Sequence, residues 1–183
     1  ASFDAADRAF LGTDFQFGAE DFTYSFWMNP EATQESYAMV FSSYAEVYTG
    51  YYFVQDALNH NKYWFRGNGG STWQPYSSTV DIPANSWTHV TIVRTGTTVS
   101  LYTNGSLAYQ DTNAVASTIS YGSSNPQLTL GGVSNSNAYN GWAGDLDDFR
   151  VWTRALDASE IATLYSDNVL LSDGLALHFA GDD

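Results

Sequence analysis

The sequence contains no cysteine and few basic residues, and each shortage excludes a class of protein. Without cysteine there can be no disulfide and no cysteine-ligated zinc site. Lys and Arg number only 6 against 20 Asp and Glu, which gives a formal net charge of −14. A surface of this sign repels nucleic acid and anionic membranes, so neither is expected as a partner. No apolar run is long enough to span a bilayer, so we expect no direct membrane insertion.

Apolar and aromatic residues are abundant by contrast. Hydrophobic residues make up 44% and aromatic residues 16% of the 183 positions, which is too apolar for a disordered chain and enough for one real core. No internal repeat or long linker divides the chain, so we predict a single domain over residues 1–183. The chain begins with neither an initiator Met nor a signal peptide, which suggests a mature product or a module of a longer protein.

Short aromatic and β-branched runs separated by polar turns predict about ten strands. The expected strands are 22–29, 37–43, 50–55, 62–67, one containing Val90 and Ile92, 98–103, 106–110, 127–132, 145–152 and 174–179. Asn104-Gly105 between two of these runs is a strong signal for a two-residue hairpin turn. The pattern predicts an all-β protein, a two-sheet antiparallel sandwich of the jelly-roll kind.

One short helix is expected near the C-terminus. Asp157 is a good N-cap, and Glu160 three residues later completes a capping box. Leu156 before the cap and Ile161 after it fit a hydrophobic staple. The helix is expected to cover one end of the sheets.

The stretch "DLDDFRVW" raises a question about charge. Strand periodicity places Asp145 and Asp147 on one face with Phe149 and Val151, which should face the core. A buried carboxylate without a partner either takes up a proton or finds a cation. Asp147 could instead accept hydrogen bonds from loop amides, pair with an arginine (Arg8 or Arg150), or be turned to water by a β-bulge.

Four motifs occurring in order carry a resemblance to a known family. "FTYSFWMNP", "SWTHVTIVRTGTTVSLYTNG", "LTLGG" and "GWAGDLDDFRVWTRALDASEIATLY" together resemble the laminin G-like, or concanavalin A-like, jelly roll of secreted and cell-surface proteins. The match covers residues 3 to about 165, and "GLALHF" resembles the closing strand. This fold hosts lectins, adhesion modules and glycosidases, so the resemblance implies the fold more strongly than the function.

The resemblance also implies a calcium site. Members often hold a structural calcium where the first strand meets the late strand, and Asp147 stands at the acidic position of that late strand. "SFDAADRAF" resembles the early acidic segment, with Asp4 and Asp7 at its acidic positions and Ala5 in place of the usual glycine. Asp145 is the fourth candidate. Calcium takes six to eight oxygen ligands, which suits a chain rich in carboxylates. We therefore predict Ca²⁺ as the cofactor.

Catalytic patterns are missing from the sequence. Jelly-roll glucanases use two Glu bracketing an Asp on one strand, and none of the five Glu residues is so placed. The three His residues are scattered, and there is no zinc-protease or nucleophile-elbow motif. We predict that the protein is not an enzyme.

A sugar site would need aromatic rings for stacking and amides for the hydroxyls. Trp64 is in phase with Lys62 and Arg66 on its strand, and Trp73 lies in the Gly/Ser-rich segment after it. The predicted ligand-binding residues are Trp73, Tyr76, Asn68 and Gln74, with Asn137 from a second, Asn-rich loop. Alternatively, Trp73 anchors the loop over a sheet edge and the asparagines form turns.

The combined prediction is a non-catalytic, calcium-stabilised carbohydrate-binding or adhesion module, extracellular as a secreted or cell-surface protein. Its partners would be a glycan or polysaccharide and other domains of a longer chain. The alternatives are a structural or protein-binding adhesin module without a sugar site, and a polysaccharide hydrolase or lyase of the same fold.

Overall fold

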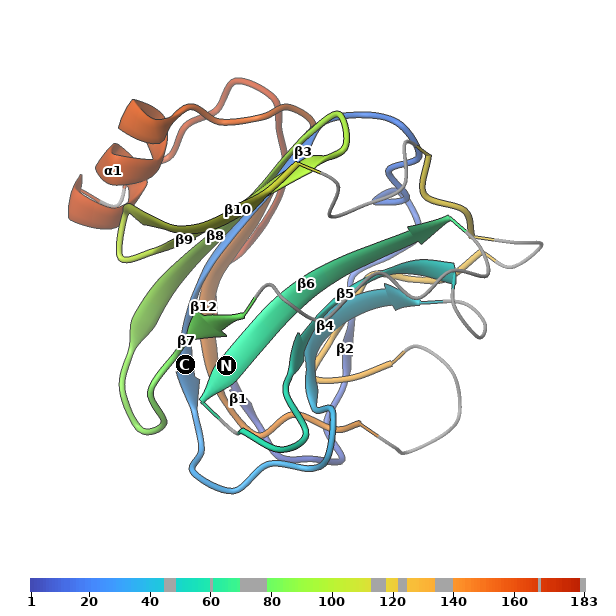
Figure 1. Ribbon diagram of the computed structural model, residues 1–183, viewed down its shortest axis with the longest axis vertical. Coiled ribbons are helices and arrows are strands. Elements are labelled where there is room, and N and C mark those ends of the chain that lie inside the picture. Colours follow the sequence, from blue (N-terminus) through green and yellow to red (C-terminus); the bar gives the residue numbers. More distant parts are fainter. Residues whose placement is uncertain are drawn as a thin grey trace.

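Two antiparallel β-sheets pack face to face in the computed structural model, with one short helix outside them (Figure 1). The structure describes residues 1–44, 49–59, 61–69, 79–112, 118–121, 125–133, 140–167 and 169–181. This architecture confirms the predicted all-β sandwich. No helix in these ranges is long and apolar enough to cross a membrane.

The seven-stranded sheet has the order β1-β12-β3-β8-β9-β10, and β13 also pairs with β12. Its strands are β1 (Ser2–Phe3), β3 (Phe22–Pro30), β8 (Thr88–Thr95), β9 (Thr98–Thr103), β10 (Ser106–Asp111), β12 (Gly144–Trp152) and β13 (Leu175–Phe179).

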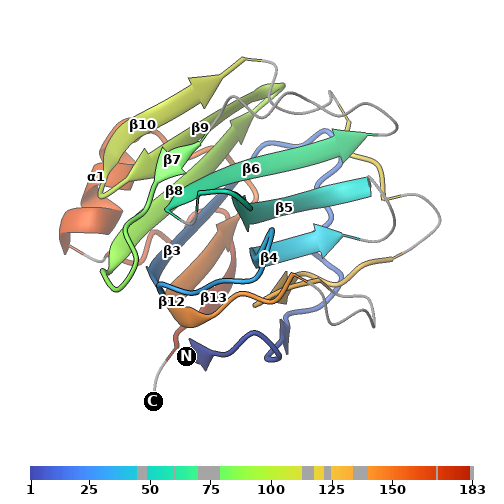
Figure 2. The same ribbon diagram turned by 60° about the horizontal axis from the view of Figure 1, so that its bottom comes forward.

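The six-stranded sheet has the order β2-β11-β4-β5-β6-β7, and Figure 2 shows β4, β5 and β6 side by side in it. Its strands are β2 (Ala9–Phe10), β4 (Met39–Tyr44), β5 (Thr49–Gln55), β6 (Lys62–Gly69), β7 (Val80–Asp81) and β11 (Thr129–Leu130). The two-residue strands β1, β2 and β7 were not predicted, because so short a run carries no periodicity.

Aromatic rings from both sheets fill the space between them. Phe26 of β3 stacks on Phe149 of β12, with ring centroids 5.4 Å apart. Phe41 of β4 meets Tyr24 of β3 across the sandwich at 4.8 Å. All four side chains are fully buried. Pairs at these distances add specific ring contacts to the burial of apolar area.

The hairpin between β9 and β10 confirms its sequence signal. Asn104 and Gly105 have φ angles of 49° and 74°, the left-handed pair that a two-residue type I′ turn requires. Asn104 also joins the turn to β8, because its Oδ1 accepts a hydrogen bond from the backbone N–H of His89 at 3.0 Å.

The predicted face of β12 is wrong, because the strand contains a β-bulge. Asp147 lies opposite Trp27 but Arg150 lies opposite Ser25, so β12 has one extra residue against β3. Asp148, within the bulge, has a φ of 50°. The extra residue shifts the alternation, so that Leu146 and Phe149 both face the core while Asp147 is exposed.

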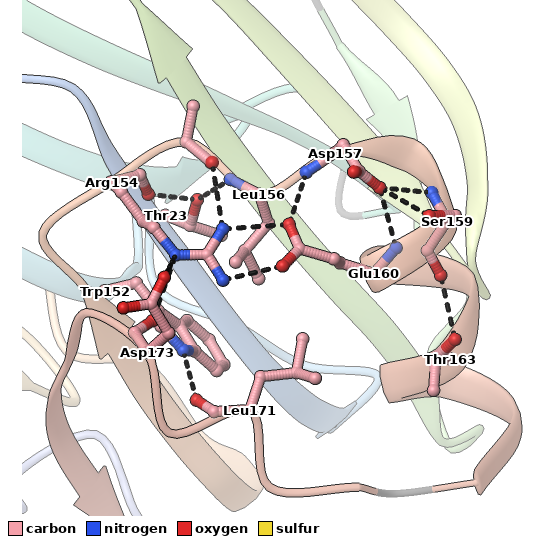
Figure 3. Close-up of polar contacts among 11 residues, drawn as sticks. Thr23, Trp152, Arg154, Leu156, Asp157, Ser159, Glu160, Thr163, Leu171 and Asp173 are labelled. Carbon is pink, nitrogen blue, oxygen red and sulfur yellow. Dashed lines mark hydrogen bonds and ion pairs between the residues drawn. The ribbon is translucent and has the colours of Figure 1, made fainter.

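Helix α1 (Ala158–Asp167) begins with the predicted capping box, drawn in Figure 3. Asp157 Oδ1 accepts hydrogen bonds from the backbone N–H of Ser159 and Glu160 at 2.8 and 2.9 Å, and Glu160 Oε2 accepts one from the N–H of Asp157 at 2.9 Å. The Arg154 guanidinium also forms an ion pair with Glu160, with Nη2 2.6 Å from Oε1.

The helix packs on the outer face of the seven-stranded sheet. Its Ile161 and Leu164 are buried in a small cluster with Val93 of β8, Trp152 of β12 and Leu156. The helix therefore covers this sheet on the side away from the six-stranded sheet, as the two views agree (Figures 1 and 2).

Candidate functional site

Two aromatic side chains and an arginine lie on the outer face of the six-stranded sheet, meaning the side that faces away from the core. The strand register pairs Tyr52 with Arg66 and Val54 with Trp64, so these four side chains share one face of β5 and β6. Their neighbours Tyr51, Phe53 and Phe65 point the other way, into the core. We call Tyr52, Trp64 and Arg66 the outer-face triad.

The two aromatic members of the triad are in contact. The rings of Tyr52 and Trp64 meet edge to face at 5.7 Å and 63°. Trp64 also packs with Met39, Val54 and Val133 in an apolar cluster separate from the main core. Tyr52 is half-buried, whereas Trp64 is only 6% exposed. The prediction that Trp64 shares a face with Arg66 is confirmed, but its side chain is buried and not half-exposed.

Arg66 brings one of the chain's six basic side chains to this face. Its residue is 3% exposed, so the guanidinium lies away from bulk water. Placing a charge there is costly unless it is compensated by polar or charged groups. Of the triad, only Tyr52 is partly exposed and open to a ligand, while the buried Trp64 packs against its ring and the buried Arg66 lies opposite it on β6.

The predicted ligand-binding residues lie close in the sequence to residues that form this face. Trp73, Gln74, Tyr76 and Asn137 lie outside the described residues. Asn68 is within β6, opposite Gly50, although its side chain is not described. The two segments that carry these residues begin directly after Gly69 of β6 and after Val133, which packs on Met39, Val54 and Trp64. Sequence reasoning did not include Tyr52 or Arg66; the alternation in "YYFVQ" and "KYWFRG" was the available signal.

The residues as placed do not fit the predicted calcium ion. Asp4 and Asp7 belong to one turn, where Asp4 Oδ1 accepts the Ala6 N–H at 2.7 Å and Asp7 Oδ2 the Asp4 N–H at 3.1 Å. In the described ranges, no three His, Cys, Asp or Glu side chains are grouped so that they could hold a metal. Calcium binding therefore remains a prediction from resemblance.

The other two predicted ligands are engaged elsewhere. Asp147 Oδ1 accepts the N–H of Asp148 at 2.8 Å and of Gly181 at 3.1 Å. Asp145 Oδ2 accepts a hydrogen bond from Asn29 Nδ2 at 3.2 Å. The question raised by "DLDDFRVW" thus has two answers: the bulge turns Asp147 outward, and backbone amides satisfy it.

Within "DLDDFRVW", the carboxylate that pairs with an arginine is Asp148. Its Oδ1 lies 2.9 Å from Arg150 Nη2 and 2.7 Å from His178 Nε2. Because Arg150 is on β12 and His178 on β13, this carboxylate joins the C-terminal strand to the sheet. The bulge places it there, which sequence periodicity does not reveal.

A serine and a histidine also meet on the seven-stranded sheet. Ser25 Oγ lies 2.8 Å from His89 Nε2, while His89 Nδ1 is buried and has no hydrogen-bond partner among the described residues. A nucleophile and base pair needs a third group to orient the base, and access for substrate. Ser25 is 2% and His89 4% exposed, so this pair has neither. It is a structural contact.

Comparison with known proteins places this geometry in a family. The family model described as the concanavalin A-like lectin/glucanases superfamily matches residues 4–162. Among proteins of curated function, no sequence matches the chain.

Solved structures share the fold at low sequence identity. A suggested carbohydrate-binding protein from Bacteroides ovatus aligns with a TM-score of 0.70 and 16% identity, over 98% of this chain and 50% of that one. Domain 4 of the extracellular arabinanase AbnA from Geobacillus stearothermophilus, in complex with arabinotriose, aligns with 0.56 and 16%, over 87% and 76%. A sialidase from Trypanosoma rangeli aligns with 0.59 and 16%, over 82% and 23%. The chain thus spans half or less of two of these proteins, and identities this low establish the fold alone.

Proposed function

Because the chain belongs to the concanavalin A-like lectin/glucanases superfamily, we propose that it is a non-catalytic carbohydrate-binding module. The observation that carries the proposal is the outer-face triad, in which the partly exposed Tyr52 ring packs on the buried Trp64, on a face turned from the core. Sugars present apolar C–H faces that pack on aromatic rings of this kind.

The likeness to an arabinanase domain in complex with arabinotriose supports a glycan as the ligand. The chain's net charge of −14 makes the approach of a polyanion unfavourable. We therefore expect a neutral glycan, which would pack on the Tyr52 ring. The predicted residues Asn68 and Trp73 follow Arg66 in the sequence, and we include them in the proposed site.

The non-catalytic part of the proposal rests on the arrangement of acids and bases. Glu20 and Glu160, two of the five Glu residues, are engaged within their own turns by hydrogen bonds from Gly18 and Asp157. The Ser25–His89 pair is closed to substrate. Retaining glycoside hydrolysis needs two carboxyl groups about 5–5.5 Å apart across a cleft, and none of the three triad residues carries a carboxyl group.

We place the module outside the cell, as a secreted or surface-bound part of a longer protein, with the glycan as its partner. The likeness to a domain of an extracellular arabinanase supports this assignment. Adhesion to a glycan-coated surface would use the same site.

The test is glycan binding by matched variants. A glycan array identifies a ligand, and calorimetry then compares wild type with Tyr52→Ala and Trp73→Ala. Losing a central aromatic contact should weaken Kd by tenfold or more, a change of about 1.4 kcal/mol. Trp87→Ala is the control, because Trp87 is a 47% exposed tryptophan in the segment between β7 and β8. Melting curves confirm that each variant is folded.

Three results would contradict the proposal. If no glycan on the array binds, the protein has no sugar site of this kind, and a structural or protein-binding module is favoured. Equal weakening by Trp87→Ala would place the site elsewhere. Release of reducing ends from a bound polysaccharide would show that the module is catalytic.

A further inference from the structure

Several oxygen atoms of the turn between β1 and β2 accept hydrogen bonds from groups in the same turn. Besides the two carboxylate contacts of Asp4 and Asp7, the Asp4 carbonyl accepts the Asp7 N–H at 3.0 Å. Both carboxylates therefore serve as caps of backbone amides within four residues. Their negative charges nevertheless lie close together in sequence, at a place where the chain folds back on itself.

Arg8 supplies a cation to this turn. Its Nη1 donates to the carbonyl oxygens of Asp7 at 2.7 Å and Ala5 at 3.2 Å. Calcium in proteins takes backbone carbonyl oxygens together with carboxylates, so a guanidinium here uses the same class of oxygen that a metal would need. The single nitrogen Nη1 donates to two of them at once.

The Arg8 guanidinium lies directly against Gly132, in the segment after β11, and we call this contact its seat. A Cβ built on Gly132 would lie 2.1 Å from Arg8 Nε and 2.3 Å from its Cζ. The neighbouring Gly131, at a φ of 78°, is as close to the turn, since its Cβ would lie 2.6 Å from the Asp7 carbonyl oxygen. Only glycines let the two segments approach this closely.

The seat also joins distant parts of the fold. Gly132 follows β11, which pairs with both β2 and β4 in the six-stranded sheet. Phe3, on the other side of the turn, is buried in the main core. Arg8 thus connects the chain's first turn to the sheet that carries the outer-face triad.

We propose that the Arg8 guanidinium, seated on Gly132, takes the place of a divalent cation at the N-terminal turn, so that the fold does not depend on calcium there. The inference is independent of sugar binding, because none of its contacts involves the triad.

A double-mutant cycle tests the seat. Arg8→Met keeps an unbranched, shorter side chain but removes the guanidinium and its charge, and Gly132→Ala forces the guanidinium out while leaving it charged. Arg8→Met should lower Tm by about 3–6 °C, as expected for charge-assisted hydrogen bonds at a half-buried site. In the Arg8→Met background, Gly132→Ala should cost clearly less than it does in wild type, because the Cζ and Nη2 atoms that the new Cβ would meet are absent and the methionine side chain is free to move. Additive losses would overturn the proposal.

Calcium and EDTA provide the second arm. Wild type should melt at the same temperature in millimolar CaCl₂ and in EDTA, and titration calorimetry should give no calcium heat. A wild-type Tm that falls in EDTA, or a calcium isotherm abolished by Asp4→Asn, would overturn the proposal and restore the metal site. Amide exchange adds a local readout: Arg8→Met should speed exchange at Asp7 and Leu11 while leaving β8 and β9 unchanged, and unchanged exchange at Asp7 would count against the seat.

Discussion

His89 should make the protein lose stability between pH 6.5 and pH 4. It lies on β8, is 4% exposed, and its ring packs at a tilt against those of Trp27 and Tyr165, with centroids 5.1 and 5.9 Å away. Burial, with the positive charge of Arg150, lowers the pKa of His89 to about 4, while Asp148 acts in the opposite direction. The imidazole is therefore neutral at pH 7 in the folded protein.

The sign and size follow from linkage. In the unfolded chain the histidine pKa is near 6.5, so the unfolded state takes up the proton first as the pH falls. A lowered pKa in the folded state means that the contribution is fully present above pH 6.5 and is lost towards pH 4. The difference between the folded and unfolded pKa values of His89 corresponds to about 3 kcal/mol of unfolding free energy. We expect about 2–3 kcal/mol after partial solvent relaxation.

The assay is urea unfolding at closely spaced pH values from 8 to 4, for wild type and His89→Gln. The variant keeps an amide near Ser25 but cannot titrate, so its unfolding free energy should change by about 3 kcal/mol less than that of wild type. Carboxyl groups with lowered pKa values, such as Asp157 and Glu160, contribute equally to both proteins. Parallel curves for the two proteins over this pH range would refute the reasoning.

Two further predictions concern the helix corner in Figure 3. Asp157→Ala removes the N-cap acceptor of two backbone amides and should lower the unfolding free energy by about 1 kcal/mol, measured by urea denaturation, with Asp157→Asn as the control that keeps the cap. Thr23 Oγ1 donates to the Arg154 carbonyl at 2.8 Å and accepts the Leu156 N–H at 3.0 Å, so Thr23→Val should cost about 1–3 kcal/mol and Thr23→Ser much less. Equal melting of the valine and serine variants would show that the hydroxyl does not matter.

Much of the fold could be read from short segments. The hairpin at Asn104-Gly105 and the capping box at Asp157 depend on contacts within a few residues, and both are confirmed. The alternation in β6 likewise placed Trp64 and Arg66 on one face. Local chemistry sets each of these, because turn angles, caps and strand phase involve only neighbouring positions.

The candidate site could be predicted only in part. Its aromatic and amide-rich loop was named from composition, but Tyr52 joins Trp64 only through the pairing of β5 with β6. The burial of Trp64 depends on Met39, Val54 and Val133, which are distant in sequence. A residue's exposure is a property of its neighbours in space, which no window of sequence contains.

The acidic corner shows the division most clearly. The sequence by itself determined that carboxylates would crowd into "DLDDFRVW" and the first turn, and that an all-β sandwich would follow from the spacing of its aromatic runs. Only the tertiary structure decided where these charged side chains lie. One extra residue in β12 turns Asp147 to water and brings Asp148 into contact with Arg150 and His178. The guanidinium of Arg8 lies against Gly132. The physical reason is that strand register and the contact of Arg8 with Gly132 depend on segments that are far apart in the chain. The pairing energy of these segments is shared among many residues, so no single motif predicts it.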